Sequence, residues 1–140
     1  MKINMVFVSA GDKMLYKKDY DKKKVAEFKS EIKKMDFKGA DKVIFKINLH
    51  EFQRNEEDKA MFDYLLENGD KFLDQDEVNS ICWKMYEKTD NKKHLEKAAS
   101  WMKTLTESEA GKNWANMDTY AAVLFKLKNK FDKSSNENIT

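Results

Sequence analysis

The side chains best suited to covalent chemistry in this sequence are its one cysteine, Cys82, and its two histidines, His50 and His94. A cysteine nucleophile needs a histidine within hydrogen-bond reach and a third group that orients the histidine. Cys82 lies between Ile81 and Trp83 in a helical apolar pattern, which predicts a buried thiol with a raised pKa and little reactivity. His94 begins the next predicted helix, where it pairs by position with the end of the preceding helix and not with Cys82. We therefore predict no catalytic residue.

A metal centre has little support in the sequence. The two histidines and the cysteine lie far apart, and neither C-x-x-C nor H-E-x-x-H spacing occurs. His50 falls at the margin of an amphipathic segment, which is typical of a surface or boundary histidine. The acidic run from Asp74 to Asn79 lacks the glycine and the distal glutamate of a calcium loop. Acids at a helix start complement the helix dipole, so we interpret this run as a helix start and expect neither metal nor cofactor.

Aromatic residues concentrated in the second half of the chain are the main candidates for binding. Trp83, Trp101, Trp114 and Tyr120 belong to this group. On a helical repeat they could line a groove for a peptide, and they would serve equally well as hydrophobic joints between helices. A platform for single-stranded nucleic acid would need interleaved arginines, and Arg54 is the only arginine. We therefore expect no nucleic-acid partner.

The composition indicates one helical domain. The chain has 140 residues, of which 41% are hydrophobic and 37% charged, so it is too apolar to be disordered. It contains no proline and four glycines, which argues against the many tight turns of β-sandwiches and barrels. We predict a single all-α domain over residues 1–133 and a frayed polar tail over residues 134–140.

Charge and hydropathy limit the partners further. The net charge is +2, which does not indicate a general nucleic-acid role. Residues 1–38 carry 11 lysines against 6 acids, whereas residues 51–77 carry 10 acids against 3 bases. We interpret these regions as solvated helix faces, with a charged partner surface as the alternative. No apolar run reaches the ~18 residues of a membrane span, and the run before Ala10 is about half of a signal-peptide core. A soluble chain is expected.

Apolar residues that recur every three or four positions predict about six helices. The predicted helices cover about 21–36, 40–54, 56–73, 75 to the Thr89–Asn91 turn, 92–106 and 114–130. The last one has an apolar stripe that we expect to face the core, formed by Met117, Tyr120, Ala121, Leu124, Phe125 and Leu127.

The first twenty residues are ambiguous. Ile3, Met5 and Phe7 alternate as they would in a strand. However, the sequence GDKML at 11–15 is echoed by GDKFL at 69–73, where a predicted helix ends. This echo favours a short helix over residues 3–16.

Short connections between these segments favour antiparallel neighbours, as in repeat proteins built from stacked helix pairs. The segments around Cys82 and Ala121 are offset by 39 residues, close to the tetratricopeptide period of about 34. We therefore predict an array of helix pairs that is similar to tetratricopeptide repeats.

Three short segments of the sequence carry a further pattern. The first contains Asn79, Trp83, Tyr86 and Glu87; the second contains Leu95, Glu96, Lys97, Ala98 and Trp101; the third contains Asp118, Thr119, Tyr120, Ala121, Leu124, Lys126 and Leu127. Together they resemble the helical, tetratricopeptide-like C-terminal region attached to a group of bacterial thioredoxin-family proteins. The resemblance covers about residues 60–133 and concerns packing, not catalysis.

The chain lacks the thioredoxin fold and the C-x-x-C pair of that family, so two-cysteine exchange is chemically impossible here. Cys82 stands where the family tends to place a small apolar residue. We expect a non-enzymatic module for protein–protein or peptide binding, or for scaffolding, with an unidentified protein or peptide partner. The alternative is an accessory helical domain of a thioredoxin-like thiol–disulfide oxidoreductase whose catalytic domain is not in this chain. An exported parent would imply a periplasmic location, and otherwise we expect a cytoplasmic one.

Overall fold

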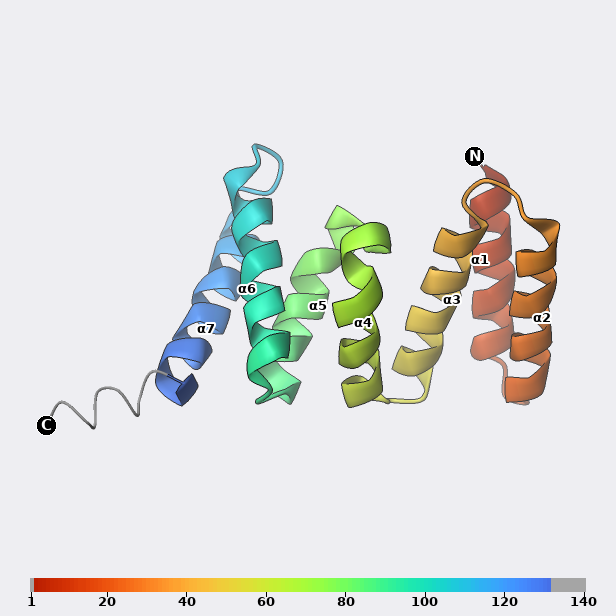
Figure 1. The fold of residues 1–140 in the computed structure, drawn as a ribbon, viewed down its shortest axis with the longest axis horizontal. Helices are drawn as coiled ribbons and strands as arrows, with labels where there is room; N and C mark the ends of the chain where they lie inside the picture. The colour runs from red at the N-terminus through yellow and green to blue at the C-terminus, as the bar shows by residue number, and fades with distance from the viewer. Residues whose placement is uncertain (1, 132–140) are drawn as a thin grey trace, which may run out of the picture. The chain divides into compact units, whose positions relative to one another are not determined.

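The computed structural model describes residues 2–131, and every regular element in that range is an α-helix (Figure 1). This confirms the all-α prediction. The helices are α1 (Lys2–Leu15), α2 (Lys22–Met35), α3 (Ala40–Arg54), α4 (Asp58–Phe72), α5 (Gln75–Lys88), α6 (Lys92–Glu107) and α7 (Trp114–Phe131). Within the described range there are seven helices instead of six, because the uncertain N-terminal segment also forms one. The predicted tail, 134–140, lies outside the described residues.

Local signals in the sequence set the starts of α2, α3 and α6. Asp21 caps α2 by accepting a hydrogen bond of 2.9 Å from the backbone N–H of Lys23. Asn91 caps α6 in the same way, with the backbone N–H of His94 as the donor at 3.2 Å. Gly39 precedes α3 at a φ of +92°, a conformation that glycine adopts without steric cost.

The chain divides into two compact units, Met1–Met61 and Phe62–Thr140, and the division falls inside α4. Each unit has its own packing. The single domain that we expect over residues 1–133 therefore stays a prediction.

The first unit is built on α1, α2 and α3, which lie side by side (Figure 1). Its buried core consists of Leu15, Val25, Ile32, Ala40, Val43 and Ile47. Partly buried aromatic rings extend this core, and the Phe7 and Phe37 rings stack with centroids 5.3 Å apart. Met35 continues the apolar spacing of Val25 and Ile32, but it is 56% exposed in the last turn of α2.

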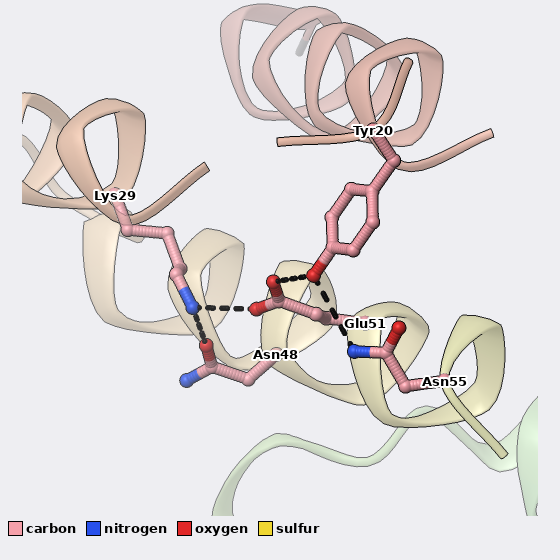
Figure 2. Close-up of polar contacts among 5 residues, drawn as sticks. All are labelled: Tyr20, Lys29, Asn48, Glu51 and Asn55. Atoms are coloured by element: carbon pink, nitrogen blue, oxygen red, sulfur yellow. Dashed lines mark hydrogen bonds and ion pairs between the residues drawn. The ribbon is translucent and has the colours of Figure 1, made fainter. Parts of the chain in front are cut away.

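A polar network in the first unit links side chains of α3 to those of the preceding segments (Figure 2). Glu51 accepts hydrogen bonds from the Tyr20 hydroxyl at 2.5 Å and from the Lys29 amine at 2.9 Å. Lys29 also donates to Asn48 at 2.7 Å, and Asn55 donates to the Tyr20 hydroxyl at 3.3 Å. Burial, followed by the hydrogen bond to Glu51, raises the pKa of Tyr20. These bonds tie α2 and the α1–α2 connection to α3.

The second unit contains α5, α6 and α7, which contact one another pairwise, together with the later part of α4 (Figure 1). Its buried apolar side chains come from all four helices: Phe62, Leu65, Val78, Ile81, Cys82, Met85, Leu95, Ala98, Met102, Leu105 and Val123. Burying one such large apolar side chain stabilises the fold by about 1.5–3 kcal/mol, so burial of these side chains holds the helices of the unit together.

The repeated Gly-Asp-Lys pattern marks the same structural feature in both units. Each copy lies at the end of a helix, α1 or α4, as the echo predicted. In each copy the glycine lets another helix pack closely. A Cβ added at Gly11 would lie 2.9 Å from Ile47 of α3, and a Cβ added at Gly69 would lie 2.6 Å from Trp101 of α6. The adjacent aspartate then binds that same helix.

Candidate functional site

The outer side of α7 carries the most exposed apolar residues of the second unit. Trp114 is 86% exposed, Met117 53%, Leu124 44% and Phe125 66%, and Ala121 is exposed between them. Their spacing of three, four, three and one residues places all five on one side of the helix. We call these five residues the α7 outer face.

The opposite side of α7 faces the core, and two of its three buried residues are polar. Asn116 is 8% exposed, Thr119 3% and Val123 0%. The Asn116 amide donates to the Gly111 carbonyl at 2.8 Å, and the Thr119 hydroxyl donates to the Ala115 carbonyl at 3.1 Å. These bonds offset the cost of burying two polar side chains.

The expected orientation of the last helix is therefore wrong for Met117, Ala121, Leu124 and Phe125. They were predicted to face the core, and all four are exposed. The reason is that α7 is apolar on both sides, so hydrophobic periodicity alone does not choose the buried one. The sequence signal for the buried side of α7 is Asn116, whose backbone N–H and side-chain amide can form hydrogen bonds with the loop around Gly111.

The loop before α7 fixes the start of this helix. Asn113 Oδ1 accepts a hydrogen bond of 3.0 Å from the backbone N–H of Asn116, which is the geometry of an N-cap. Gly111 is buried, and a Cβ there would lie 2.0 Å from the Leu105 carbonyl oxygen, so no side chain fits. Ser108 accepts the Gly111 N–H at 3.0 Å and closes the loop.

Ion pairs fix the C-terminal half of α7. The Lys126 amine donates to the Tyr86 carbonyl at the end of α5 and lies 3.4 Å from the Asp90 carboxylate. Lys130 approaches the same carboxylate to 3.2 Å. The hydrogen bond from Lys130, followed by its charge and by Lys126, lowers the pKa of Asp90. A cavity of about 340 Å³ lies beside these groups, lined by Tyr86, Glu87, Phe125, Lys126, Asn129 and Lys130.

The four aromatic residues singled out in the sequence lie in different surroundings. Trp83 on α5 is 41% exposed and packs on Tyr86, with ring centroids 5.0 Å apart. Trp114 belongs to the α7 outer face, whereas Tyr120, also on α7, is half-buried. Trp101 on α6 is half-buried against α4. Trp114 is thus the one of the four that lies on the α7 outer face.

Trp101 is a joint between α4 and α6. Its indole N–H donates to Asp70 at 2.7 Å, and Lys97 donates to the other oxygen of that carboxylate at 2.9 Å. The bond from Lys97, followed by the bond from Trp101, lowers the pKa of Asp70. The ring also lines a cavity of about 340 Å³ with residues including Leu73, Val78 and Thr104.

His94 lies in a fixed polar chain, away from the thiol. Its ring is 1% exposed, with Nε2 2.7 Å from the Asp63 carboxylate and Nδ1 3.0 Å from the Thr89 hydroxyl. A carboxylate only accepts, so Nε2 carries the hydrogen, and in the neutral ring Nδ1 accepts from Thr89. Thr89 also accepts the Asn91 N–H at 3.0 Å. The order of carboxylate, imidazole and hydroxyl resembles a catalytic triad, but here it joins α4 to the α5–α6 turn.

Cys82 and His50 occupy the positions that the sequence indicated. Cys82 is 0% exposed, and burial raises the pKa of its thiol to about 12, which leaves it unreactive at neutral pH. Its thiol lies 3.6 Å from the Ala98 carbonyl. His50 is a boundary residue, with Nδ1 2.6 Å from the Asp12 carboxylate. The run from Asp74 to Asn79 is indeed a helix start, with Asp76 and Glu77 in the first turn of α5.

Two further findings concern the described residues only. No three His, Cys, Asp or Glu side chains among them lie close enough together to hold a metal ion. None of the described helices is both long enough and apolar enough to cross a membrane.

Comparisons with protein-family models, with curated proteins and with solved structures found no match for this chain. They therefore do not test the resemblance to the helical region of thioredoxin-family proteins.

Proposed function

We propose that this chain is a non-enzymatic helical module that binds another polypeptide through the α7 outer face. The observation that carries this proposal is the orientation of α7, which buries Asn116 and Thr119 and exposes Trp114, Met117, Leu124 and Phe125. A helix that carries apolar residues on both sides is normally covered on both sides. A contiguous exposed apolar surface of this kind is typical of an interaction site.

The chemistry of the face defines the partner. The face is a ridge along one helix, so it is complementary to the apolar stripe of another amphipathic helix. Two aromatic side chains and a methionine supply the residue types that are enriched at the centres of interfaces. Contacts between helices two apart in sequence, α1 with α3 and α5 with α7, support the interpretation as a repeat similar to tetratricopeptide repeats.

Selection of displayed, helix-forming peptides against the immobilised chain tests this proposal. We expect the recovered peptides to share apolar residues at positions i, i+3, i+4 and i+7. Their affinity should fall at least about tenfold for Phe125→Glu, because an unpaired carboxylate buried in an apolar contact costs more than 1.4 kcal/mol. Phe125 is 66% exposed, so this change leaves the fold intact.

The matched control is Ala115→Glu, which adds the same charge to an exposed position of α7 outside the face. It should leave peptide affinity unchanged. Peptides that bind Phe125→Glu and the original chain equally well would contradict the proposal. So would repeated failure to select any peptide with a bait whose helical circular dichroism is intact.

The alternative function, an accessory domain beside a thioredoxin-like catalytic domain, has one supporting observation. The three sequence segments that carry the resemblance lie on α5, α6 and α7, which are consecutive helices that pack on one another. Under this alternative the chain alone should not reduce insulin, because its single thiol is buried. Addition of the chain should change the rate of a cognate thioredoxin-like domain, and an unchanged rate would exclude the alternative.

A further inference from the structure

The α7 outer face is complementary to itself. We propose that its partner is a second copy of this chain, bound with the two α7 helices antiparallel and crossing at Ala121. This inference rests on the proposed function, since it names the occupant of the same face. A two-fold interface requires one patch that matches its own rotated copy, and three features of α7 meet that requirement.

The first feature is the small residue at the centre. Ala121 is exposed and lies midway between Trp114 and Lys128, each seven residues away. Two helices approach most closely where their side chains are small, at interaxial distances of about 8–10 Å. A two-fold axis at Ala121 therefore lets the larger side chains on either side interdigitate across the contact.

The second feature is the match between positions on the two sides of Ala121. Met117 lies four residues before Ala121 and Leu124 three residues after it, on the same edge of the face. Rotation about the two-fold axis brings Met117 of one copy onto Leu124 of the other. Trp114 of one copy lies opposite Lys128 of the other, which is the arrangement of a cation–π contact.

The third feature is charge. The exposed residues next to the face include one acid, Asp118, on the N-terminal side of Ala121 and one base, Lys128, on the C-terminal side. In an antiparallel pair the two lie within about 6 Å along the helix axis, at a rise of 1.5 Å per residue. In a parallel pair, like charges would be adjacent, so the charges favour the antiparallel arrangement.

The area is sufficient for a weak dimer. Aromatic side chains present about 150–250 Å² each, so Trp114 and Phe125 contribute roughly 300 Å² per copy at their observed exposure. With Met117 and Leu124 the two copies bury about 1,000 Å², which is the lower limit for a specific interface. Interfaces at this lower limit are typical of weak, transient association, so we expect a dissociation constant on the order of 10–100 µM.

Sedimentation velocity of the purified chain between about 1 and 300 µM tests the inference, because this range spans the expected dissociation constant. We expect a monomer–dimer equilibrium that goes no further. Ala121→Glu should weaken it at least tenfold, because two like charges then meet at the axis, and Ala115→Glu should leave it unchanged. Ala121→Cys should form a disulfide-linked dimer on oxidation, because Cys82 is buried and does not compete.

The charge pair gives a test of orientation. Lys128→Glu should weaken dimerisation several-fold. The double change Asp118→Lys with Lys128→Glu should recover part of this loss, because it rebuilds the charge pair but not the contact between Trp114 and Lys128. Restoration would not follow from a parallel or nonspecific contact, so its failure would overturn the antiparallel arrangement.

Three other results would overturn the inference. The first is a monomer at every concentration, the second is a dimer that Ala121→Glu does not affect, and the third is assembly beyond the dimer. The third would indicate a head-to-tail contact, for which the exposed Met5 and Val6 of α1 are the candidate surface. A monomer that still selects peptides sensitive to Phe125→Glu would refute self-association and leave the proposed function standing.

Discussion

We predict that the effect of Gly69→Ala on the free energy of unfolding changes sign with the residue at position 101. Gly69 lies inside α4, where alanine is ordinarily the better residue by about 1 kcal/mol. An added Cβ would lie 2.6 Å from both Cη2 and Cζ2 of the Trp101 ring. The ring cannot easily move away, because its N–H is bonded to Asp70 at 2.7 Å.

The magnitudes predict that the clash outweighs the helix propensity. Overpacking of a close contact costs about 1–3 kcal/mol, so Gly69→Ala should lower the free energy of unfolding by about 1 kcal/mol net. In a Trp101→Leu background the shorter side chain vacates the space beside Gly69. There Gly69→Ala should raise the free energy of unfolding by about 0.5–1 kcal/mol. The coupling between the two changes is therefore about 2 kcal/mol.

Urea denaturation of the four proteins in this cycle measures the effect, followed by circular dichroism and by tryptophan fluorescence. Trp83, Trp101 and Trp114 all lie in the second unit, so fluorescence reports on that unit. A stabilising Gly69→Ala in the original background would refute the reasoning. An equal effect in both backgrounds would show that the ring does not set the cost.

Three further predictions concern buried or bonded groups of the second unit. His94→Leu should lower the free energy of unfolding by about 2–4 kcal/mol, because the hydrogen bonds of His94 to the Asp63 carboxylate and to the Thr89 hydroxyl are lost. A loss below about 0.5 kcal/mol, as for an ordinary surface substitution, would show that these bonds do not stabilise the fold. The raised pKa of Cys82 means that its stabilising contribution is complete below pH 9.0, the ordinary thiol value, and is lost as pH rises toward about 12. Relative to Cys82→Val, the original chain should therefore lose about 1.4 kcal/mol by pH 10, and parallel pH curves would exclude this linkage. The lowered pKa of Asp70 stabilises the fold above its ordinary value of 3.8, so Asp70→Asn should cost less than about 1 kcal/mol at pH 7 for this exposed pair, and the difference should vanish in acid.

The helices of this protein were largely predictable because their ends carry local signals. Asp21, Asn91 and Gly39 mark helix starts through capping or backbone geometry, and these effects depend on neighbouring residues only. The echo between residues 11–15 and 69–73 also predicted the first helix correctly, because both copies serve the same close approach of a helix. The burial of Cys82 followed from its place on a single clear apolar stripe.

The orientation of α7 and the partners of His94 could not be predicted in the same way. Both sides of α7 offer apolar residues, and the choice depends on hydrogen bonds from Asn116 to the preceding loop. Asp63 is 31 residues from His94 in sequence, so only the packing of α4 on α6 brings them together. The division within α4 likewise has no composition signal, because no flexible linker marks it.

The two anchors of α7 have a consequence for the kinetics of any association. Asn113 and Asn116 hold its beginning, and Lys126 and Lys130 hold its later turns against Asp90. The ridge between them is thus rigid before an encounter, and only side-chain rotamers are left to order on contact. We therefore expect association without a slow folding step, at rates of about 10⁵–10⁷ M⁻¹s⁻¹ that are typical of preformed surfaces, and differences in affinity should arise from how fast the bound pair separates.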